Sequence, residues 1–287
     1  MGSASMRAGW EILDRRGVPN FANPDRAVKA AEAMCRYAGW RTSEPAEPRS
    51  YDFDAGAIRR TIDGARAKGR DTLGEREARA IAGACGIPMP KSVFAADEDA
   101  AVRAAAEMGG PVVVKISSDD ILHKSDAGGV AVGLEDEAAV RGAFRKVMDS
   151  ARAYKADAQL DGVLVQEMAP KGREVIVGVN RDPQFGPVIM FGLGGVYVEV
   201  LKDVTFRVAP LTEGDAWEMI RSIRSARILE AFRGEPAGDL DALADCLMRV
   251  SQLAVQFPEL AECDLNPLRV YAEGRGIMAL DVRFGLA

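Results

Sequence analysis

The sequence predicts an α/β fold whose elements form α+β subdomains, and three observations support this. Apolar runs of strand length alternate with segments of helical periodicity along most of the 287 residues. No repeat of a fixed period is evident. Hydrophobic residues make up 48% of the chain, enough for one large core or two small ones.

Composition excludes several classes of protein. The net charge of −6 and the pI of about 5.1 favour neither nucleic acid nor an anionic membrane as a partner. No apolar run approaches the roughly 20 residues of a bilayer span, and no secretory signal begins the chain. The four cysteines form no C-x-x-C pair, so we expect reduced thiols in a cytoplasmic protein. A single histidine excludes a multi-histidine metal centre.

The N-terminal 41 residues are predicted to be separate from the rest. Residues 42–50 (TSEPAEPRS) are polar and contain two prolines, which predicts a linker. Before it, Asn23 can cap a helix whose first position is Pro24. About 40 residues are too few to stabilise a core, so we expect this segment to pack on something else.

After the linker, helices and strands alternate. Thr72 and Glu75 have capping-box spacing, which predicts a helix that ends at Gly86. Asp97 can cap a second helix that runs to about Met108. Further helices are expected over Asp136–Tyr154, Thr212–Ile223 and Asp239–Phe257. Strands are expected over Val93–Ala95, Val112–Ile116, Val130–Leu134, Gly162–Met168, Arg173–Asn180, Pro187–Phe191, Leu268–Tyr271 and Ile277–Val282.

The loop Ser117–Val130 (SSDDILHKSDAGGV) contains the only histidine, His123, and the pair Gly128-Gly129. Glycine pairs let backbone N–H groups approach an anion, and a histidine can carry a covalent group as a nucleophile. The alternative is a turn between two strands with a histidine that only forms hydrogen bonds. Taken alone, the loop favours this second interpretation.

Two further positions suggest a nucleotide site. Lys115 lies near the end of a strand that is apolar throughout, so it needs an anionic partner such as a phosphate, unless it reaches solvent at the strand end. Glu167, in Val165–Met168 (VQEM), can accept a hydrogen bond from an adenine amino group or pair with Lys115, and neighbouring backbone groups can read the purine edge. The alternative for Glu167 is a solvated strand end.

Acidic and amide side chains gather near the C-terminus. Asp264 and Asn266 lie in Glu262–Pro267 (ECDLNP), and Asp281 lies in Ala279–Val282 (ALDV). Hard oxygen ligands of this kind suit Mg²⁺, although Asp and Asn also favour turns. The glycine-rich Phe191–Val196 (FGLGGV) is not a Rossmann fingerprint, and no P-loop motif is present.

In their order, these segments resemble the ATP-grasp domain of NDP-forming acyl-CoA synthetases. The resemblance extends from about Tyr51 to the C-terminus, with ILHKSDAGGV as its most specific part. It implies an ATP-grasp fold of two subdomains with the nucleotide in the cleft between them. The smaller lobe would span about 92–165, and the larger lobe about 166–287 together with the helix at 72–90.

The resemblance also implies a role for each candidate residue. Lys115 would contact nucleotide phosphates, Gly128 and Gly129 would form a mobile phosphate loop, and Glu167 with the backbone of Met168 would bind the adenine edge. Asp264, Asn266 and Asp281 would hold Mg²⁺ against ATP or ADP, and Glu174 and Arg207 would line the same cleft. His123 would be the catalytic phosphohistidine that passes a phosphoryl group to ADP.

The resemblance implies that this chain is part of an ADP-forming acid–CoA ligase. Its CoA-binding domain or subunit is absent from this chain, and residues 1–41 are similar to the stretch that joins the two parts in fused enzymes. One alternative is a regulatory ATP-grasp module without full ligase activity, for example fused to an acetyltransferase. Another is a carboxylate–amine ligase, whose chemistry does not require the histidine.

Overall fold

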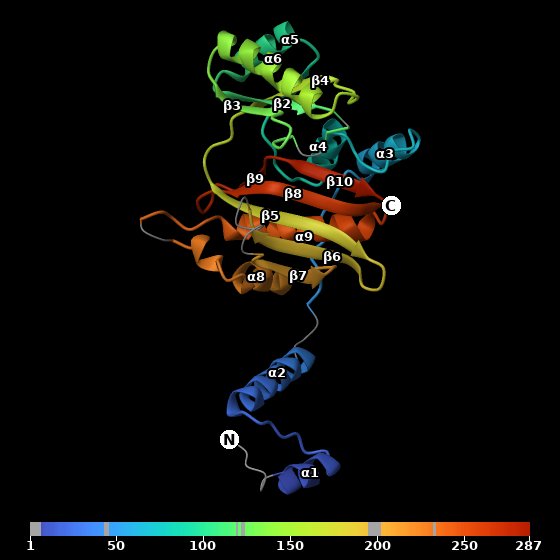
Figure 1. The fold of residues 1–287 in the computed structure, drawn as a ribbon, viewed down its shortest axis with the longest axis vertical. Helices are drawn as coiled ribbons and strands as arrows, with labels where there is room; N and C mark the ends of the chain where they lie inside the picture. Colours follow the sequence, from blue (N-terminus) through green and yellow to red (C-terminus); the bar gives the residue numbers. More distant parts are fainter. Residues whose placement is uncertain (1–6, 43–45, 119, 122–123, 195–201, 232–233) are drawn as a thin grey trace. The chain divides into compact units, whose positions relative to one another are not determined.

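The computed structural model describes residues 7–42, 46–118, 120–121, 124–194, 202–231 and 234–287 (Figure 1). The chain divides into two compact units, Met1–Glu47 and Pro48–Ala287. No helix in the described ranges is both long enough and apolar enough to cross a bilayer.

The N-terminal unit contains two helices, α1 (Arg7–Arg15) and α2 (Pro24–Thr42). Helix α2 begins at the predicted proline, whereas α1 was not predicted. Neither helix buries a residue. Large apolar side chains are exposed throughout the unit: Ile12, Leu13, Val18, Phe21, Val28, Met34, Tyr37 and Trp40. Within its described residues, the unit therefore has no core of its own.

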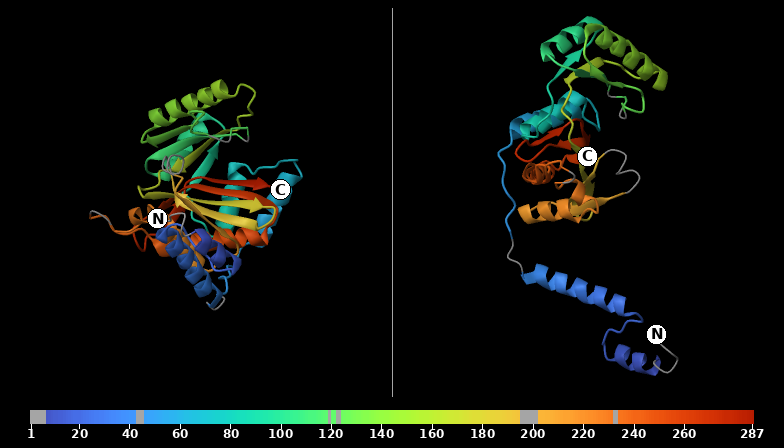
Figure 2. Two further views of the ribbon diagram at one scale, coloured as in Figure 1. Left: turned by 60° about the horizontal axis from the view of Figure 1, so that its bottom comes forward. Right: turned by 90° about the vertical axis from the view of Figure 1, so that its left-hand side faces the viewer.

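The second unit contains a four-stranded antiparallel sheet with the order β1-β4-β2-β3. Its strands are β1 (Ser92–Ala95), β2 (Val112–Ser117), β3 (Val130–Leu134) and β4 (Gly162–Glu167). Helices α5 (Glu98–Met108) and α6 (Glu137–Tyr154) cover one face, as Figure 2 shows. The side chains of Val112, Val114, Ile116, Val163 and Val165 pack with them in one apolar cluster. Asp97 and Asp136 cap these helices, which confirms both predicted starts.

A six-stranded sheet forms the rest of the second unit. Its main path is β10-β8-β5-β6-β7, and β9 pairs with β8 (Figure 1). The strands are β5 (Arg173–Asp182), β6 (Gly186–Leu193), β7 (Val204–Val208), β8 (Leu260–Val270), β9 (Ile277–Ala279) and β10 (Val282–Leu286). The helices of this part are α3 (Ala55–Arg66), α4 (Glu75–Ala84), α8 (Glu213–Ser222), the short 3-10 helix η2 (Ala226–Ile228) and α9 (Leu240–Gln256). Helices α8 and α9 pack against the sheet, and α4 packs beside β10.

Three predictions for this part were wrong. The single strand expected at Ile277–Val282 is interrupted, because β9 ends at Ala279 and β10 begins at Val282, so Asp281 lies between the two strands. The strand expected at Leu268–Tyr271 begins at Leu260, so Asp264 and Asn266 lie inside β8 and not in a turn. The capping box of α4 does not involve Thr72 and Glu75: the N-cap is Gly74, whose N–H donates to the Glu77 carboxylate at 2.9 Å. Helix α3 and strand β7 were also not predicted. Both have apolar residues at the spacing of their element: Ile58, Ile62 and Ala65 recur on one side of α3, and Val204, Phe206 and Val208 alternate along β7.

The end of the predicted linker is attached to the second unit. The Tyr51 N–H donates to the side-chain oxygen of Gln252 at 2.7 Å, and the Gln252 amide donates back to the Tyr51 carbonyl at 2.8 Å. The Tyr51 hydroxyl donates to Asp245 at 2.8 Å, and Arg49 pairs with the same carboxylate at 3.4 Å. The chain is therefore fixed on α9 from about residue 49 onward.

A substitution at Gly162, the first residue of β4, tests the packing of the smaller sheet. The Gly162 φ of +140° is a glycine-only conformation, and a Cβ there would lie 2.3 Å from the Ala95 carbonyl oxygen. We expect Gly162→Ala to lower the free energy of unfolding by about 3 kcal/mol, measured by urea denaturation. Gly133→Ala is the control, because it has a φ of +71° but open space, so only about 1 kcal/mol should be lost. Equal losses would contradict the account.

Candidate functional site

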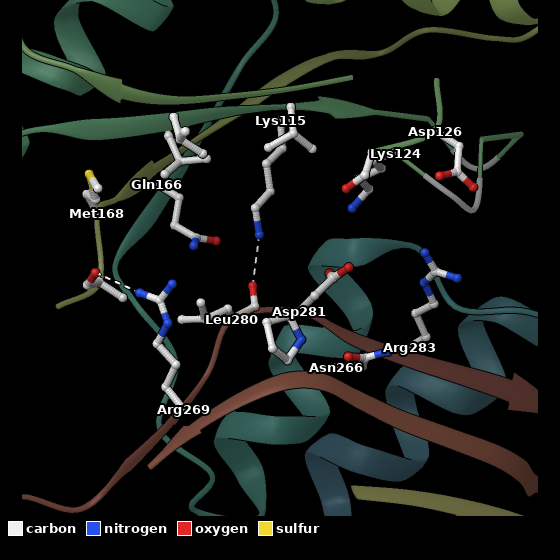
Figure 3. A pocket seen from close by; sticks show the side chains of 16 residues that line it. Lys115, Lys124, Asp126, Gln166, Met168, Asn266, Arg269, Leu280, Asp281 and Arg283 are labelled. Atoms are coloured by element: carbon white, nitrogen blue, oxygen red, sulfur yellow. Dashed lines mark hydrogen bonds between the residues drawn. The ribbon is translucent and has the colours of Figure 1, made fainter. Parts of the chain in front are cut away.

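A cavity of about 440 Å³ lies between the two sheets (Figure 3). One wall comes from β2, β3 and the end of β4, and the other comes from β8 and the segment around β10. Its polar and charged lining residues are Lys115, Lys124, Ser125, Asp126, Gln166, Asn266, Arg269, Asp281 and Arg283. Apolar side chains such as Val113, Val132, Met168, Pro267 and Leu280 complete it.

Strand register brings the predicted metal ligands together. Asp264 on β8 lies opposite Arg283 on β10, and the Asn266 N–H donates to the Asp281 carbonyl at 3.3 Å. Asp264 and Asn266 lie two residues apart on β8 and so share one face, while Leu265 and Val282 are buried on the other. Asp281, just before β10, lines one cavity with Asn266 and another with Asp264. Asp264, Asn266 and Asp281 therefore lie on the face of the larger sheet that is turned away from its core.

This donor set fits a magnesium ion held together with a nucleotide. Among the described residues, no group of three or more His, Cys, Asp or Glu side chains could by itself hold a metal ion. Two carboxylates and one amide oxygen are present instead, at Asp264, Asp281 and Asn266. Mg²⁺ commonly uses one or two carboxylates and takes its remaining ligands from water and substrate phosphates.

Lys115 lies on the opposite wall. Its side chain points across the cavity, and its Nζ donates to the Leu280 carbonyl at 2.8 Å (Figure 3). Lys115 is only 8% exposed, and burial lowers the pKa of its amine, while the nearby carboxylates of Asp281 and Glu75 oppose that shift. The solvated-lysine alternative is therefore wrong, because Lys115 is a buried cation facing acidic groups.

A second cation, Lys124, was missed by the sequence analysis. Its amine forms an ion pair with Glu75, the first residue of α4, and both side chains are nearly buried. Lys124 also borders an adjoining cavity of about 330 Å³ that Glu75, Asp264, Asp281 and Arg283 help to line. No sequence signal placed Glu75 here, because it lies 49 positions away from Lys124 along the chain.

The glycine pair forms a tight turn. The N–H of Gly128 donates to the Ser125 carbonyl at 3.0 Å, and the N–H of Gly129 donates to the Lys124 carbonyl at 2.7 Å. A Cβ on Gly129 would lie 2.6 Å from Cγ2 of Ile116, so packing also requires glycine there. In this conformation both N–H groups are donated within the turn, so the predicted phosphate contacts through them would require the turn to open. His123 lies outside the described residues.

The predicted adenine-binding positions are only partly at the cavity. The Glu167 side chain is exposed and does not line it, whereas the preceding Gln166 is buried and does. Alternation along β4 explains this, since Gln166 shares the cavity face with Lys115 through the pairing of β4 with β2. Met168 does line the cavity, but its N–H already donates to the Pro111 carbonyl at 3.0 Å.

Gln166 has a partner that the sequence analysis also missed. Nη1 of Arg79, on α4, donates to the Gln166 side-chain oxygen at 3.3 Å, and Nη2 donates to the Pro90 carbonyl. Burial lowers the pKa of Arg79, while Glu75 and Asp281 raise it. Because a guanidinium only donates, the amide group of Gln166 is oriented with its oxygen toward Arg79.

The last two predicted residues differ in their placement. Glu174 accepts hydrogen bonds from Arg269, a lining residue, at 3.1 and 3.0 Å, so it adjoins the cavity without lining it. Arg207 does not line the cavity. It lies on β7 opposite Ile189, whose side chain faces the core under the helices, and it pairs with Glu218 on α8 at 3.2 Å. Alternation puts Arg207 on the wrong face of the sheet for the predicted contact.

Comparison with known proteins identifies the family. The sequence profile of the ATP-grasp domain matches residues 64–286, so the chain belongs to the ATP-grasp family. It is 50% identical over 225 residues to subunit beta of the ADP-forming acetate–CoA ligase I of Pyrococcus furiosus, a match that covers 78% of this chain and 96% of that subunit. It is 42% identical over 276 residues to the ADP-forming 4-hydroxybutyrate–CoA ligase of Nitrosopumilus maritimus, which covers 96% of this chain but 40% of that ligase.

Solved structures agree with this assignment. The fold matches the dinucleotide-forming acetyl-coenzyme A synthetase 1 of Candidatus Korarchaeum cryptofilum in complex with coenzyme A, Ca-AMPCP and HgCl+, with a TM-score of 0.77 and 44% identity over 80% of this chain and 99% of that one. Another structure of that enzyme, with coenzyme A and Mg-AMPPCP, has a phosphohistidine segment pointing towards the nucleotide binding site (TM-score 0.69, 43% identity, 80% and 100% coverage).

The predicted family and fold are thus confirmed. The chain corresponds to the β-subunit-like ATP-grasp part of ADP-forming acyl-CoA synthetases. It spans about 40% of the length of the single-chain ligase from Nitrosopumilus maritimus.

The buried Lys115 amine should make stability depend on pH. Its folded-state pKa lies below the usual 10.5, so between the two values the unfolded chain binds more protons, and raising the pH favours the folded state. The free energy of unfolding of wild type minus that of Lys115→Met should therefore rise as the pH is raised towards 10.5. Urea denaturation between about pH 7 and pH 10 measures it. Lys146→Met, at an exposed lysine on α6, is the control, and a constant difference for Lys115→Met would contradict the prediction.

Proposed function

We propose that the cavity between the sheets binds ATP or ADP with Mg²⁺. The observation that carries this proposal is the arrangement of charge across one cavity. The buried cation Lys115 extends from the smaller sheet and faces Asn266 and Asp281 across this cavity. Asp264, on the same face of the larger sheet, lines the adjoining cavity together with Asp281. A magnesium nucleotide satisfies both walls at once, because phosphates need cations and Mg²⁺ needs oxygen ligands.

The two sheets then form the two lobes of the domain. The smaller lobe, about residues 92–165, contributes Lys115 and the turn at residues 124–129, which begins with Lys124. The larger lobe, about 166–287 with the helix at 72–90, contributes the face with Asp264, Asn266 and Asp281. Met168 and the buried Gln166 stand at the opposite end of the cavity from Lys124 and Asp126 (Figure 3), so we place the base of the nucleotide there in preference to a contact with the Glu167 carboxylate.

The chemistry that we assign to this site is phosphoryl transfer through a phosphohistidine. Acyl-CoA and phosphate give acyl phosphate and CoA, and a histidine of the CoA-binding part takes the phosphoryl group and releases the acid. His123 accepts that phosphoryl group and transfers it to the terminal phosphate oxygen of ADP, which forms ATP. Bound Mg²⁺ neutralises phosphate charge, while Lys115 and Lys124 position the phosphates.

The full reaction needs a CoA-binding domain or subunit in addition to this chain. The N-terminal unit supports this, because its helices bury no residue and expose Met34, Tyr37 and Trp40. The long single-chain relative matches 96% of this chain, whereas the separate beta subunit matches 78%. We infer that residues 1–41 belong structurally to the CoA-binding part, with residues 42–50 as the connection. A cytoplasmic location follows from this proposed function.

Asp281→Asn tests the magnesium nucleotide site. Removing one carboxylate should weaken Mg-ADP binding about tenfold or more, which is at least about 1.4 kcal/mol. Binding of ADP without Mg²⁺ should change much less. Isothermal titration calorimetry with and without Mg²⁺ measures both quantities. Asp149→Asn, at an exposed carboxylate on α6, is the matched control. Equal effects of the two substitutions on Mg-ADP binding would contradict a role for Asp281 in binding Mg²⁺.

His123→Ala tests the phosphoryl step separately. The variant should bind Mg-ADP like wild type, because the cavity is intact. Mixed with a CoA-binding subunit of an ADP-forming ligase, it should lose the acid-labile, base-stable label that wild type takes from γ-labelled ATP. Full labelling and turnover by the variant would exclude His123 as the acceptor, without affecting the proposal for nucleotide binding.

A further inference from the structure

The chain crosses between the two sheets through a short segment at one end of the cavity. Residues 168–172 connect the end of β4 in the smaller sheet to the start of β5 in the larger one. Met168 and Ala169 of this crossover line the cavity. Gly172 packs closely on β8, since a Cβ there would lie 2.9 Å from the Val270 carbonyl oxygen. This segment therefore forms one end of the cavity and connects the two sheets there.

Arg269 of β8 holds this crossover with one planar guanidinium. Nη1 donates to the carbonyls of Ala169 at 2.9 Å and Pro170 at 2.8 Å, and Figure 3 shows the side chain reaching toward this segment. Nε and Nη2 donate to one oxygen of the Glu174 carboxylate at 3.1 and 3.0 Å. Four hydrogen bonds thus join the crossover, β5 and β8 through a single side chain.

Glu174 is what orients this guanidinium. It lies directly opposite Arg269 in the pairing of β5 with β8, so their side chains extend from the same face of the sheet. The hydrogen bonds from Nε and Nη2 to Glu174 fix the plane of the guanidinium group. In that plane, Nη1 is directed toward the two crossover carbonyls. Glu174 itself does not line the cavity, so it acts on the cavity only through Arg269.

We infer that Arg269, oriented by Glu174, is a positioning residue that clamps the crossover and so shapes the nucleoside end of the nucleotide site. This inference rests on the proposed function of the cavity. It gives Glu174 a role that differs from direct contact with the ligand. Lysine cannot replace Arg269, because a single ammonium group does not present the planar fork that reaches a carboxylate on one side and two carbonyls on the other.

The test compares Arg269→Lys and Glu174→Gln with wild type in two measurements. The first is calorimetric binding of Mg-ADP and of Mg-tripolyphosphate, which carries the phosphates without a nucleoside. Arg269→Lys should weaken Mg-ADP binding about fivefold to tenfold and leave tripolyphosphate binding nearly unchanged. Glu174→Gln should act in the same direction with a smaller effect. A merely destabilised protein would bind both ligands less well.

The second measurement needs no ligand. Lys171 is a trypsin site inside the crossover, and its cleavage should be faster in both variants. Arg181→Lys is the matched control, because Arg181 lies in the same sheet but donates to a single carbonyl, that of Ala254 at 2.6 Å. The Arg181→Lys variant should have the Mg-ADP affinity of wild type, and trypsin should cleave it at Lys171 at the wild-type rate.

The outcomes separate the two proposals. If wild type does not bind Mg-ADP, the proposed function is wrong, and the cleavage rates at Lys171 still decide whether Arg269 clamps the crossover. If wild type binds Mg-ADP but Arg269→Lys retains its affinity and its resistance to trypsin, the clamp is wrong. Equal weakening of ADP and tripolyphosphate binding by Arg269→Lys would also overturn the inference, because the effect would not be confined to the nucleoside end.

Discussion

The site depends on one buried cation. The Lys115 amine is almost fully removed from solvent, and in the structure it bonds to a backbone carbonyl of the opposite wall at 2.8 Å. A buried ammonium group is costly unless charge or hydrogen bonds compensate it, which requires the acidic face of β8 and the Asp281 segment to lie across from β2. The same requirement makes the cavity suited to phosphates, because they can supply the compensating negative charge directly.

The alternation of side chains along the strands decides which residues reach that cavity. On β4 it directs Gln166 inward and Glu167 outward, and on β7 it directs Arg207 toward the helices. On β8 and the segment before β10 it places Asp264, Asn266 and Asp281 together. A shift by one residue in any of these strands would exchange the cavity lining for core residues, so the pairing register and the binding chemistry are inseparable.

Local signals predicted most elements of the fold but not the contacts between distant segments. Aspartates at helix starts and apolar runs placed α5, α6, α9 and β2 to β4 within one or two residues, because such signals act within a few positions. Helix α3 and strand β7 were missed although their apolar residues have helical spacing (Ile58, Ile62, Ala65) and strand alternation (Val204, Phe206, Val208). Strand β8 was predicted too short because its acidic positions resemble a turn. Glu75, Arg79 and Arg269 were missed as site residues because their partners lie far away along the chain, and only tertiary structure joins them.

The central claim is that one nucleotide binds both sheets at the same time. Hydrogen exchange of the chain with and without Mg-ADP tests it most directly, because each wall is reported separately. The account predicts slower exchange in β2 and the turn at 124–129, and also in β8 and residues 280–283, with no change in α8. Protection confined to one sheet, or located outside both walls, would contradict it.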